Sequence, residues 1–305
     1  MELRELKIFR DIAQEKNFVK AAKLNFLTQP SVSSHLKHLE EELGVRLFER
    51  VPRKVSLTQE GEFLLPHAEE LLLKCENLKT LISKSKGIAK GDIRIATVYS
   101  IGMYELAPTL KRFIRMYPDI HVHLQYRRSD IVYDLLLENK IDVGMVAYPE
   151  DRPRIQVTPL GNDHLVLIAP PHHPLARQKS VRLKRIEGEN FIAFDSGIPT
   201  RETIDRKLEQ KGVKVHVRMT NENIDTLKRA VEVGLGISIV PGKTVAEEVR
   251  KRTLKSIQIS DAKLNRPLGI LTLKDRIPSY PLQLFMEVLT NHTEKNGAGV
   301  RRQKE

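Results

Sequence analysis

Three patterns in the 305-residue sequence predict an all-α winged helix-turn-helix, a coiled-coil linker helix and an α/β domain, in that order. Residues 17–57 combine two helix caps, a pair of small residues and a helix with one apolar stripe. Residues 58–86 carry apolar side chains at an average spacing close to 3.5. From residue 93 onward, short apolar segments alternate with amphipathic ones, as strands alternate with helices in an α/β fold.

The helix-turn-helix begins at Asn17, which can cap a short helix containing Ala21 and Ala22. These two small side chains let a second helix pack closely. Thr28 can cap the second helix, and Pro30 is tolerated in its first turn because an N–H there has no helical partner. The predicted buried stripe of the second helix consists of Val32, Leu36, Leu39 and Leu43.

The outer face of the second helix is polar, with short or basic side chains suited to the major groove of DNA. The candidate DNA contacts on this helix and the following wing are Thr28, Gln29, Pro30, Ser31, Ser33, Ser34, Lys37, Arg50 and Arg53. His35 and His38 lie one turn apart and are expected to face DNA or solvent. A solvated surface helix would show the same polarity, but it would not require caps, tight packing and a polar face to coincide.

The motifs follow one another as LRELKIFRDIAQEKNF, the alanine pair, LTQPSVSSHLKHLEEELGVRLFER and a wing that ends LTQEGEFLLP. In this order they resemble the N-terminus of the LysR-type bacterial transcriptional regulators. Ser34 stands where many family members carry an arginine, so one strong DNA contact is absent. The resemblance implies a transcriptional regulator that binds double-stranded DNA as a homo-oligomer, either a dimer or a tetramer. RNA polymerase is a further partner consistent with it.

Composition agrees with a DNA-binding protein but does not locate its surface. The net charge is +12 and the pI about 9.6. Residues 1–90 contribute 16 minus 13, or +3, and the remainder 35 minus 26, or +9. One cysteine rules out an intrachain disulfide framework, and no stretch approaches about 18 uncharged apolar residues. With acidic residues at positions 2 and 5 and no signal-peptide core, the sequence predicts a soluble cytoplasmic protein.

A long helix is predicted from a cap at Thr58 to about Lys86, with a kink at Pro66. Its apolar positions are spaced by 4, 3, 4, 3 and 4 residues, which is typical of a coiled-coil seam: Leu64, Ala68, Leu71, Cys75, Leu78 and Ile82. An amphipathic helix packed on its own domain is the alternative. The resemblance favours a dimerisation helix, in which Cys75 is a small hydrophobic residue.

Beyond a short hinge at 87–92 (GIAKGD), the pattern predicts an α/β domain and a disordered tail over 292–305. The expected strands cover 93–98, 121–127, 141–147, 165–169, 191–194, 213–219, 237–240 and 268–273. The expected helices cover 103–116, 130–138, 200–211, 224–233, 244–250 and 282–291.

The resemblance extends through this half on the segments IDVGMVAYP, PHHPLA and AVEVGLGISIVP. It implies an effector-binding domain similar to periplasmic solute-binding proteins, with two α/β lobes beside a cleft. The implied domains are 1–57 for DNA binding, 58–90 for the linker helix and hinge, and 91–291 for the effector. Lobe I comprises 91–164 and 266–291, and lobe II comprises 165–265.

Four residues at the starts of predicted helices are candidate effector contacts, and the resemblance places them along the cleft: Ser100, Ser129, Thr200 and Asn223. Free N–H groups at helix N-termini favour anions, although Ser, Thr and Asn are also ordinary helix caps. Arg127 and Arg128 add positive charge and favour an anionic effector. Alternation along the strand sends only one of these arginines toward the cleft, and either could be the one.

No catalytic or metal-binding set stands out in the sequence. Gly234 and Gly236 follow a predicted helix and precede a strand, the reverse of a dinucleotide-binding motif. His172 and His173 have no accompanying ligand cluster and favour a turn. We therefore expect neither enzyme activity nor a cofactor or metal. An enzyme or solute-binding protein on a two-lobed domain, with N-terminal assembly helices, is the alternative.

Overall fold

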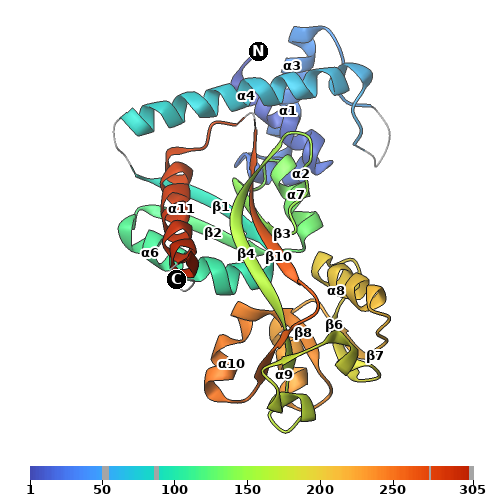
Figure 1. The fold of residues 1–305 in the computed structure, drawn as a ribbon. Helices are drawn as coiled ribbons and strands as arrows, with labels where there is room; N and C mark the ends of the chain where they lie inside the picture. Colours follow the sequence, from blue (N-terminus) through green and yellow to red (C-terminus); the bar gives the residue numbers. More distant parts are fainter. Residues whose placement is uncertain (50–54, 86–88, 275, 302–305) are drawn as a thin grey trace. The chain divides into compact units, whose positions relative to one another are not determined.

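The computed structural model describes residues 1–49, 55–85, 89–274 and 276–301. The chain forms two compact units, each described here by itself (Figure 1). The first comprises Met1–Ile88 with Arg276–Tyr280, and the second comprises Ala89–Asp275 with Pro281–Glu305.

The first unit contains the predicted helix-turn-helix. Its helices are α1 (Leu3–Glu15), α2 (Phe18–Leu24), α3 (Gln29–Leu43) and α4 (Gln59–Ser85). Asn17 caps α2 by accepting hydrogen bonds from the backbone N–H groups of Val19 and Lys20, at 2.9 and 3.0 Å. The small core combines apolar side chains from all four helices: Leu6, Ile8, Phe9, Ile12, Ala21, Ala22, Val32, Leu36, Leu39 and Ala68.

One member of the predicted stripe on α3 is not buried. Leu43 is 38% exposed, whereas Val32 and Leu39 are fully buried. The helix ends at Leu43, and Gly44 turns the chain away in the left-handed conformation, at φ 68°. Leu43 therefore lies beyond the reach of the helices that cover the rest of the stripe.

The base of the wing is a short antiparallel pair in which Phe48 bridges to Leu57. The backbone N–H of Glu49 donates to the carbonyl of Ser56 at 2.9 Å. The wing residues 50–54, including Arg50 and Arg53, lie outside the described residues. As predicted, the Thr58 hydroxyl caps α4 by accepting from the N–H of Gly61 at 3.1 Å. The helix continues through Pro66.

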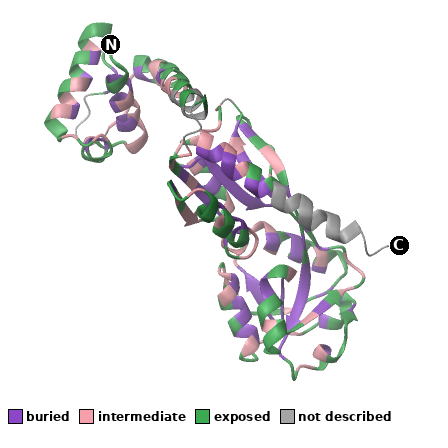
Figure 2. Cartoon of the chain, turned by 90° about the vertical axis from the view of Figure 1, so that its left-hand side faces the viewer, coloured by how far each residue is buried: buried purple, intermediate pink, exposed green. Residues whose placement is uncertain are grey.

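Lobe I of the second unit is a sheet with helices on both faces (Figure 1). Parallel strands β1 (Gly91–Thr97), β2 (Ile120–Tyr126) and β3 (Val143–Ala147) pair in the order β2-β1-β3. Its helices are α5 (Tyr99–Ile101), η1 (Gly102–Leu106), α6 (Ala107–Met116), α7 (Ser129–Leu137) and α11 (Tyr280–Arg301). Helices α6 and α11 meet at Phe113 and Phe285, whose ring centroids lie 5.2 Å apart. Figure 2 shows the buried strands between exposed helix faces.

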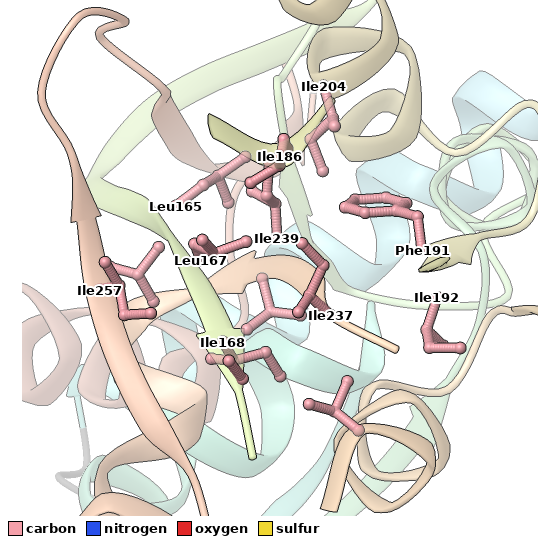
Figure 3. Close-up of a cluster of buried hydrophobic side chains, with 14 of the residues drawn as sticks. Leu165, Leu167, Ile168, Ile186, Phe191, Ile192, Ile204, Ile237, Ile239 and Ile257 are labelled. Atoms are coloured by element: carbon pink, nitrogen blue, oxygen red, sulfur yellow. The ribbon is translucent and has the colours of Figure 1, made fainter. Parts of the chain in front are cut away.

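Lobe II is built around the core in Figure 3, where side chains such as Leu167, Phe191 and Ile239 meet. Its strands are β5 (Ser180–Val181), β6 (Asn190–Phe194), β7 (His216–Asn221), β8 (Ser238–Pro241) and β9 (Lys255–Ile259). Its helices are η2 (Pro174–Arg177), η3 (Leu183–Ile186), α8 (Pro199–Gln210), α9 (Ile224–Glu232), η4 (Gly242–Val245) and α10 (Ala246–Lys251). The predicted turn at His172 and His173 is confirmed, since His173 caps η2.

Two long antiparallel strands connect the lobes. In lobe I, β10 (Asn265–Leu273) pairs with β3 and with the first part of β4 (Ile155–Ala169). In lobe II, residues 165–169 of β4 pair with β8 and β9. The chain crosses between the lobes where His164 pairs with Asn265.

The prediction missed the first part of β4, together with β5 and β9. Residues 155–164 contain Pro159, Gly161 and three polar residues in a row, so they form no apolar run. They are nevertheless a strand because β10 supplies a continuous partner from Leu273 back to Asn265. Tertiary pairing overrides weak local preference here.

The C-terminal segment also differs from its prediction. Helix α11 reaches Arg301, although disorder was expected from residue 292. Its first turns are anchored by buried Leu282, Phe285 and Val288. Once nucleated, a helix adds further residues at low cost, which accounts for its extension. Strand β1 begins at Gly91, within the segment 87–92 predicted as a hinge. Residues 86–88, 275 and 302–305 lie outside the described residues.

Gly61 in the first turn of α4 tests the packing of the wing base. A Cβ at this position would lie 2.2 Å from the carbonyl oxygen of Leu47. We expect Gly61→Ala to lower the free energy of unfolding by about 1–3 kcal/mol, although alanine normally stabilises a helix. Denaturant unfolding measures this loss, with the neighbouring exposed Glu62→Ala as control. Equal stability of the two variants would contradict this packing.

Candidate nucleic-acid interface and ligand cleft

Helix α3 presents the predicted polar surface. Its exposed side chains include Gln29, Pro30, Ser34 and Lys37, while Ser31 and Ser33 are half-buried. The Thr28 hydroxyl accepts from the N–H of Ser31 at 3.4 Å, so Thr28 acts as the cap. Several short polar groups thus stand free on one face at the start of the helix, the arrangement by which such helices contact base edges.

The rest of α3 is tied to its own unit. Glu40 accepts from the backbone N–H of Leu47 at 2.8 Å and so holds the wing base against the helix. Lys37 pairs with Glu41 at 3.3 Å, although both side chains are exposed. Such an exposed pair contributes little stability, and Lys37 can leave it for a phosphate.

His38 remains exposed, but its Nδ1 lies 2.6 Å from Oε1 of buried Glu5 in α1. Burial alone would raise the pKa of Glu5, but bonds from the Glu2 backbone and from His38 lower it overall. Among the described residues, Glu5, His38 and Glu42 have ligand atoms within 4.8 Å of one another, close enough for a metal ion. Both oxygens of Glu5 already accept hydrogen bonds, one from His38 and one from the Glu2 N–H at 2.8 Å.

The apolar seam of α4 divides into two parts. Ala68 is buried in the core of the first unit, and Leu64 packs against that core. Farther along the helix, Leu71, Leu78 and Ile82 are 42%, 61% and 57% exposed. The alternative stated above, that this helix packs on its own domain, therefore applies only to the first part of α4. The second part is an apolar stripe that the described residues of this chain leave exposed.

The second unit contains a cavity of about 420 Å³ lined by both lobes. All the predicted effector residues line it: Ser100, Ser129, Thr200 and Asn223, with Arg127 and Arg128. Each of the four lies at a junction between a strand and the following helix: β1–α5, β2–α7, β6–α8 and β7–α9. Because β1 and β2 are parallel, and so are β6 and β7, these junctions lie at matching strand ends.

Two of the longer helices begin at the cavity without a side-chain cap. The cap positions of α7 and α8 are Arg128 and Ile198, and neither side chain bonds the first turn. Their first backbone N–H groups can therefore donate to an anion. In contrast, Asn223 caps α9 by accepting from the N–H groups of Asp225 and Thr226, at 2.8 and 3.3 Å. The side-chain oxygen of Asn223 is therefore already used as a helix cap.

Arg266 is the important cleft residue that the sequence analysis missed. It lines the cavity, is only 4% exposed, and bridges the lobes. Its Nη2 donates to the Ser100 hydroxyl at 2.7 Å, and its Nε donates to the Thr200 hydroxyl at 3.4 Å. The Oδ2 atom of Asp163 lies 4.0 Å from the Nη1 atom of Arg266. Burial lowers the pKa of Arg266 and raises that of Asp163, while each charge opposes the other's shift.

The acidic side chains of the cavity lining lie at its exposed rim, together with Arg127 and Arg128, whereas the buried charge of the lining is Arg266. These lining acids are Asp130, Glu150, Glu202 and Glu222. Glu150 is also paired with Arg152 at 2.9 Å. A ligand that reaches the inner wall therefore meets a guanidinium, two hydroxyls and helix N-termini. This arrangement suits a small anion.

Of the two adjacent arginines, Arg128 faces across the cleft. A Cβ built on Gly197 of lobe II would lie 3.2 Å from its Nη2. Arg127 instead donates from Nη1 to the neighbouring carbonyl of Tyr126 at 2.8 Å. Both arginines line the cavity, so the expectation that only one of them faces the cleft is not met. Strand β2 ends at Tyr126, and strand alternation therefore does not apply to residues 127 and 128.

No helix in the described part of the chain has both the length and the apolar character needed to cross a membrane.

Comparisons with known proteins agree with this division. A model of bacterial regulatory helix-turn-helix proteins of the lysR family matches residues 3–62, and one of the LysR substrate binding domain matches 86–294. The chain is 30% identical over 292 residues to the HTH-type transcriptional activator CmpR of Synechocystis sp., with 96% of each covered. It is 30% identical over 293 residues to a probable RuBisCO transcriptional regulator of Phaeodactylum tricornutum, with 94% of this chain and 95% of the relative covered.

Among solved structures, the chain is similar to the regulatory domain of Synechocystis PCC6803 CcmR in complex with 2-PG. The identity is 25% and the TM-score 0.62, over 67% of this chain and 98% of that domain.

Proposed function

The chain belongs to the LysR family of bacterial transcriptional regulators, and on that premise we propose how it works. It is a DNA-binding regulator with an effector-binding domain of two α/β lobes, and its homologues are regulators rather than enzymes. The proposals concern the residues that contact DNA, the surface that joins copies of the chain, and the chemistry of the effector.

The DNA-contacting surface that we propose is the outer face of α3 and its cap, completed by Arg50 and Arg53 of the wing. On the helix it comprises Thr28, Gln29, Pro30, Ser31, Ser33, Ser34 and Lys37. Its support is the exposure of Gln29, Ser34 and Lys37 on a helix whose opposite face is buried. Gln29 lies in the first turn, where its amide can pair with adenine, and Lys37 is placed for a phosphate.

We expect Gln29→Ala to weaken binding to the specific operator by about 1–3 kcal/mol and to leave binding to random duplex nearly unchanged. Fluorescence anisotropy on both duplexes measures the two affinities. Lys37→Ala is the matched control on the same face, and it should weaken both because a phosphate contact carries no sequence information. Equal losses on both duplexes in Gln29→Ala would remove its role in base recognition.

The exposed second part of the α4 stripe is proposed to join two copies of the chain as a coiled coil. Its support is the exposure of Leu71, Leu78 and Ile82 at heptad spacing. A dimer places two recognition helices at two half-sites. We further propose a tetramer, contact with RNA polymerase, and domain boundaries at residues 57 and 90, with α11 continuing past the expected end of the effector domain at residue 291. The cytoplasmic location stays a prediction.

Leu71→Glu places a carboxylate in this proposed seam, where burying it unpaired costs several kcal/mol. We expect folded monomers that bind the operator weakly, because two half-sites are no longer engaged together. Sedimentation gives the mass, and circular dichroism checks the fold. Glu69→Gln, off the seam, is the control. An unaltered oligomer in Leu71→Glu would place the interface elsewhere.

The effector that we propose is a small anion held between Arg266, the hydroxyls of Ser100 and Thr200, and the N-termini of α7 and α8. Ser129 and Asn223 complete the wall. The observation that carries this proposal is the buried guanidinium, which contacts a hydroxyl from each lobe. The related CcmR domain in complex with 2-PG supports a small anionic effector. As the probe anion for the experiments below we choose 2-phosphoglycolate, which carries a phosphate and a carboxylate.

Thr200→Val removes one hydroxyl without changing side-chain size. We expect the dissociation constant for 2-phosphoglycolate to rise about tenfold, which corresponds to one hydrogen bond to a charged group at about 1.4 kcal/mol. Titration calorimetry on the full chain measures it, and DNA binding without anion should stay unchanged. Thr226→Val, on exposed α9 surface outside the cavity, is the control. Wild-type affinity in both Ser100→Ala and Thr200→Val would refute the cleft assignment.

A further inference from the structure

A polar network centred on one buried lysine, Lys228, joins the two lobes beside the cavity. It comprises Tyr99 and Tyr104 of lobe I, and Asp225, Lys228 and Glu248 of lobe II, and is called the interlobe latch below. We propose that the latch holds the lobes at the spacing in which the cleft binds its anion, with Tyr104, Asp225 and Lys228 as positioning residues. The effect on anion binding rests on the function proposed above, whereas the effect on lobe spacing does not.

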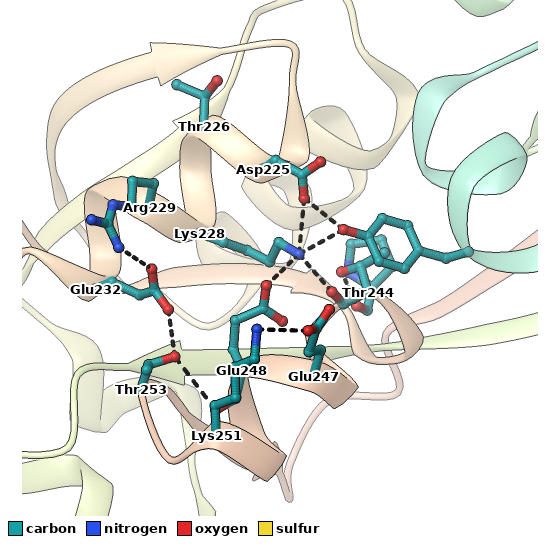
Figure 4. Close-up of polar contacts among 12 residues, drawn as sticks. Asp225, Thr226, Lys228, Arg229, Glu232, Thr244, Glu247, Glu248, Lys251 and Thr253 are labelled. Carbon is teal, nitrogen blue, oxygen red and sulfur yellow. Dashed lines mark hydrogen bonds and ion pairs between the residues drawn. The ribbon is translucent and has the colours of Figure 1, made fainter.

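Lys228 is the centre of the latch and is only 4% exposed. Its ammonium group lies 2.7 Å from Glu248 and 2.9 Å from Asp225. Figure 4 shows Lys228 among Asp225, Thr244 and Glu248, and the ammonium group also donates to the carbonyl of Thr244 at 2.9 Å. A further hydrogen bond, to the Tyr104 hydroxyl, is 2.6 Å long. Three of these four partners belong to lobe II, so the Tyr104 hydroxyl is the contact that links this charge to lobe I.

Asp225 carries the link to the cavity wall. One of its oxygens accepts from Tyr104 at 2.5 Å, and the other accepts from Tyr99 at 2.8 Å. Tyr99 lines the cavity, whereas Tyr104 and Lys228 do not. Asp225 also lies in the first turn of α9, two residues after Asn223 of the cavity wall. A change at Tyr104 can therefore reach the cavity through the positions of Asp225 and Tyr99.

The donors and acceptors of the latch are fixed at neutral pH. Burial and the bond to Asp225 raise the pKa of Tyr104 to about 12, so its hydroxyl keeps its proton. Burial would lower the pKa of Lys228, but Glu248, Tyr104 and Asp225 raise it overall. Burial would raise the pKa of Asp225, but its hydrogen bonds lower it. The tyrosines therefore donate to a carboxylate, and the ammonium donates to Tyr104.

Separation of the lobes would break the bonds from both tyrosines and leave buried Lys228 without its Tyr104 partner. Leaving a buried charged donor with one partner fewer is costly, so the latch favours the lobe arrangement that it spans. Lys243 of lobe II also pairs with Glu105 of lobe I at 2.8 Å, but the lysine is half-exposed and solvent screens this pair. An anion that bridges the lobes binds more tightly when this arrangement is already populated.

Tyr104→Phe tests the latch, because it removes one oxygen that lies outside the cavity. We expect the dissociation constant of the full chain for 2-phosphoglycolate to rise about fivefold, and the change in operator affinity that this anion causes to shrink. Tyr117→Phe, in the same lobe and outside both the latch and the cavity lining, is the matched control. The melting temperature checks the fold, and Asp225→Asn replaces Tyr104→Phe if that variant unfolds.

Lobe spacing is measured without any ligand. Spin labels on Asp134→Cys of α7 and Glu209→Cys of α8, in a Cys75→Ala chain diluted with unlabelled chain, report the distance between the lobes by pulsed EPR. Both labelled positions are exposed. We expect Tyr104→Phe to broaden this distribution or shift it to longer distances, and Tyr117→Phe to leave it unchanged.

An unchanged distance distribution in Tyr104→Phe would overturn the latch, whatever the anion affinity. A changed distribution with unchanged affinity would overturn its effect on the cleft. If the wild-type chain binds neither 2-phosphoglycolate nor inorganic phosphate, the proposed effector chemistry fails. The distance measurement still decides whether the latch sets the lobe spacing.

Discussion

A buried guanidinium at the junction of the two lobes is the constraint on which the second unit depends. Arg266 is almost completely removed from water, and its nearest carboxylate, on Asp163, is 4.0 Å away. An arginine has five N–H donors, more than the hydroxyls of Ser100 and Thr200 can satisfy. Charge buried with so little compensation is costly, and an anion in the adjacent cavity would offset that cost. The proposed anion site would therefore offset an electrostatic cost that the fold creates.

The crossing strands give this charge its position. Arg266 lies on β10 next to Asn265, where the chain passes from one lobe to the other beside β4. A side chain at this point contacts both lobes, so its hydrogen bonds depend on how the two lobes are arranged. Helices α7 and α8 begin at the ends of parallel strands and point their free N–H groups toward the same space. An anion held there gains contacts from both lobes, so it stabilises whichever lobe spacing brings these contacts together.

The sequence predicted the parts of the site that depend on local signals. Asn17, Thr28 and Thr58 are caps, and a cap is defined by residues two or three positions along the same chain. Ser100, Ser129 and Thr200 were found in the same way, because each lies between a strand and a helix. Whether these residues contact an effector was beyond such reasoning, since a cap and a ligand contact share the same residue types.

The parts that were missed depend on residues far apart in the chain. Arg266 contacts Ser100, 166 positions away, and lies in a strand with no motif around it. Lys228 and Tyr104 are 124 positions apart, and the sequence around each predicts only that it lies in a helix. Such pairs become visible only when the fold brings them together. The adjacent arginines show the same limit. Alternation predicted that only one of Arg127 and Arg128 faces the cleft, but β2 ends at Tyr126 and both arginines line the cavity.

The most direct test of the account is a crystal structure of the effector domain within the full chain, grown with 2-phosphoglycolate. The account predicts density for the anion in the cavity, with its charged oxygens within hydrogen-bond distance of Arg266 and of the hydroxyls of Ser100 and Thr200. Anion density in another part of the molecule, with this cavity holding only water, would contradict it.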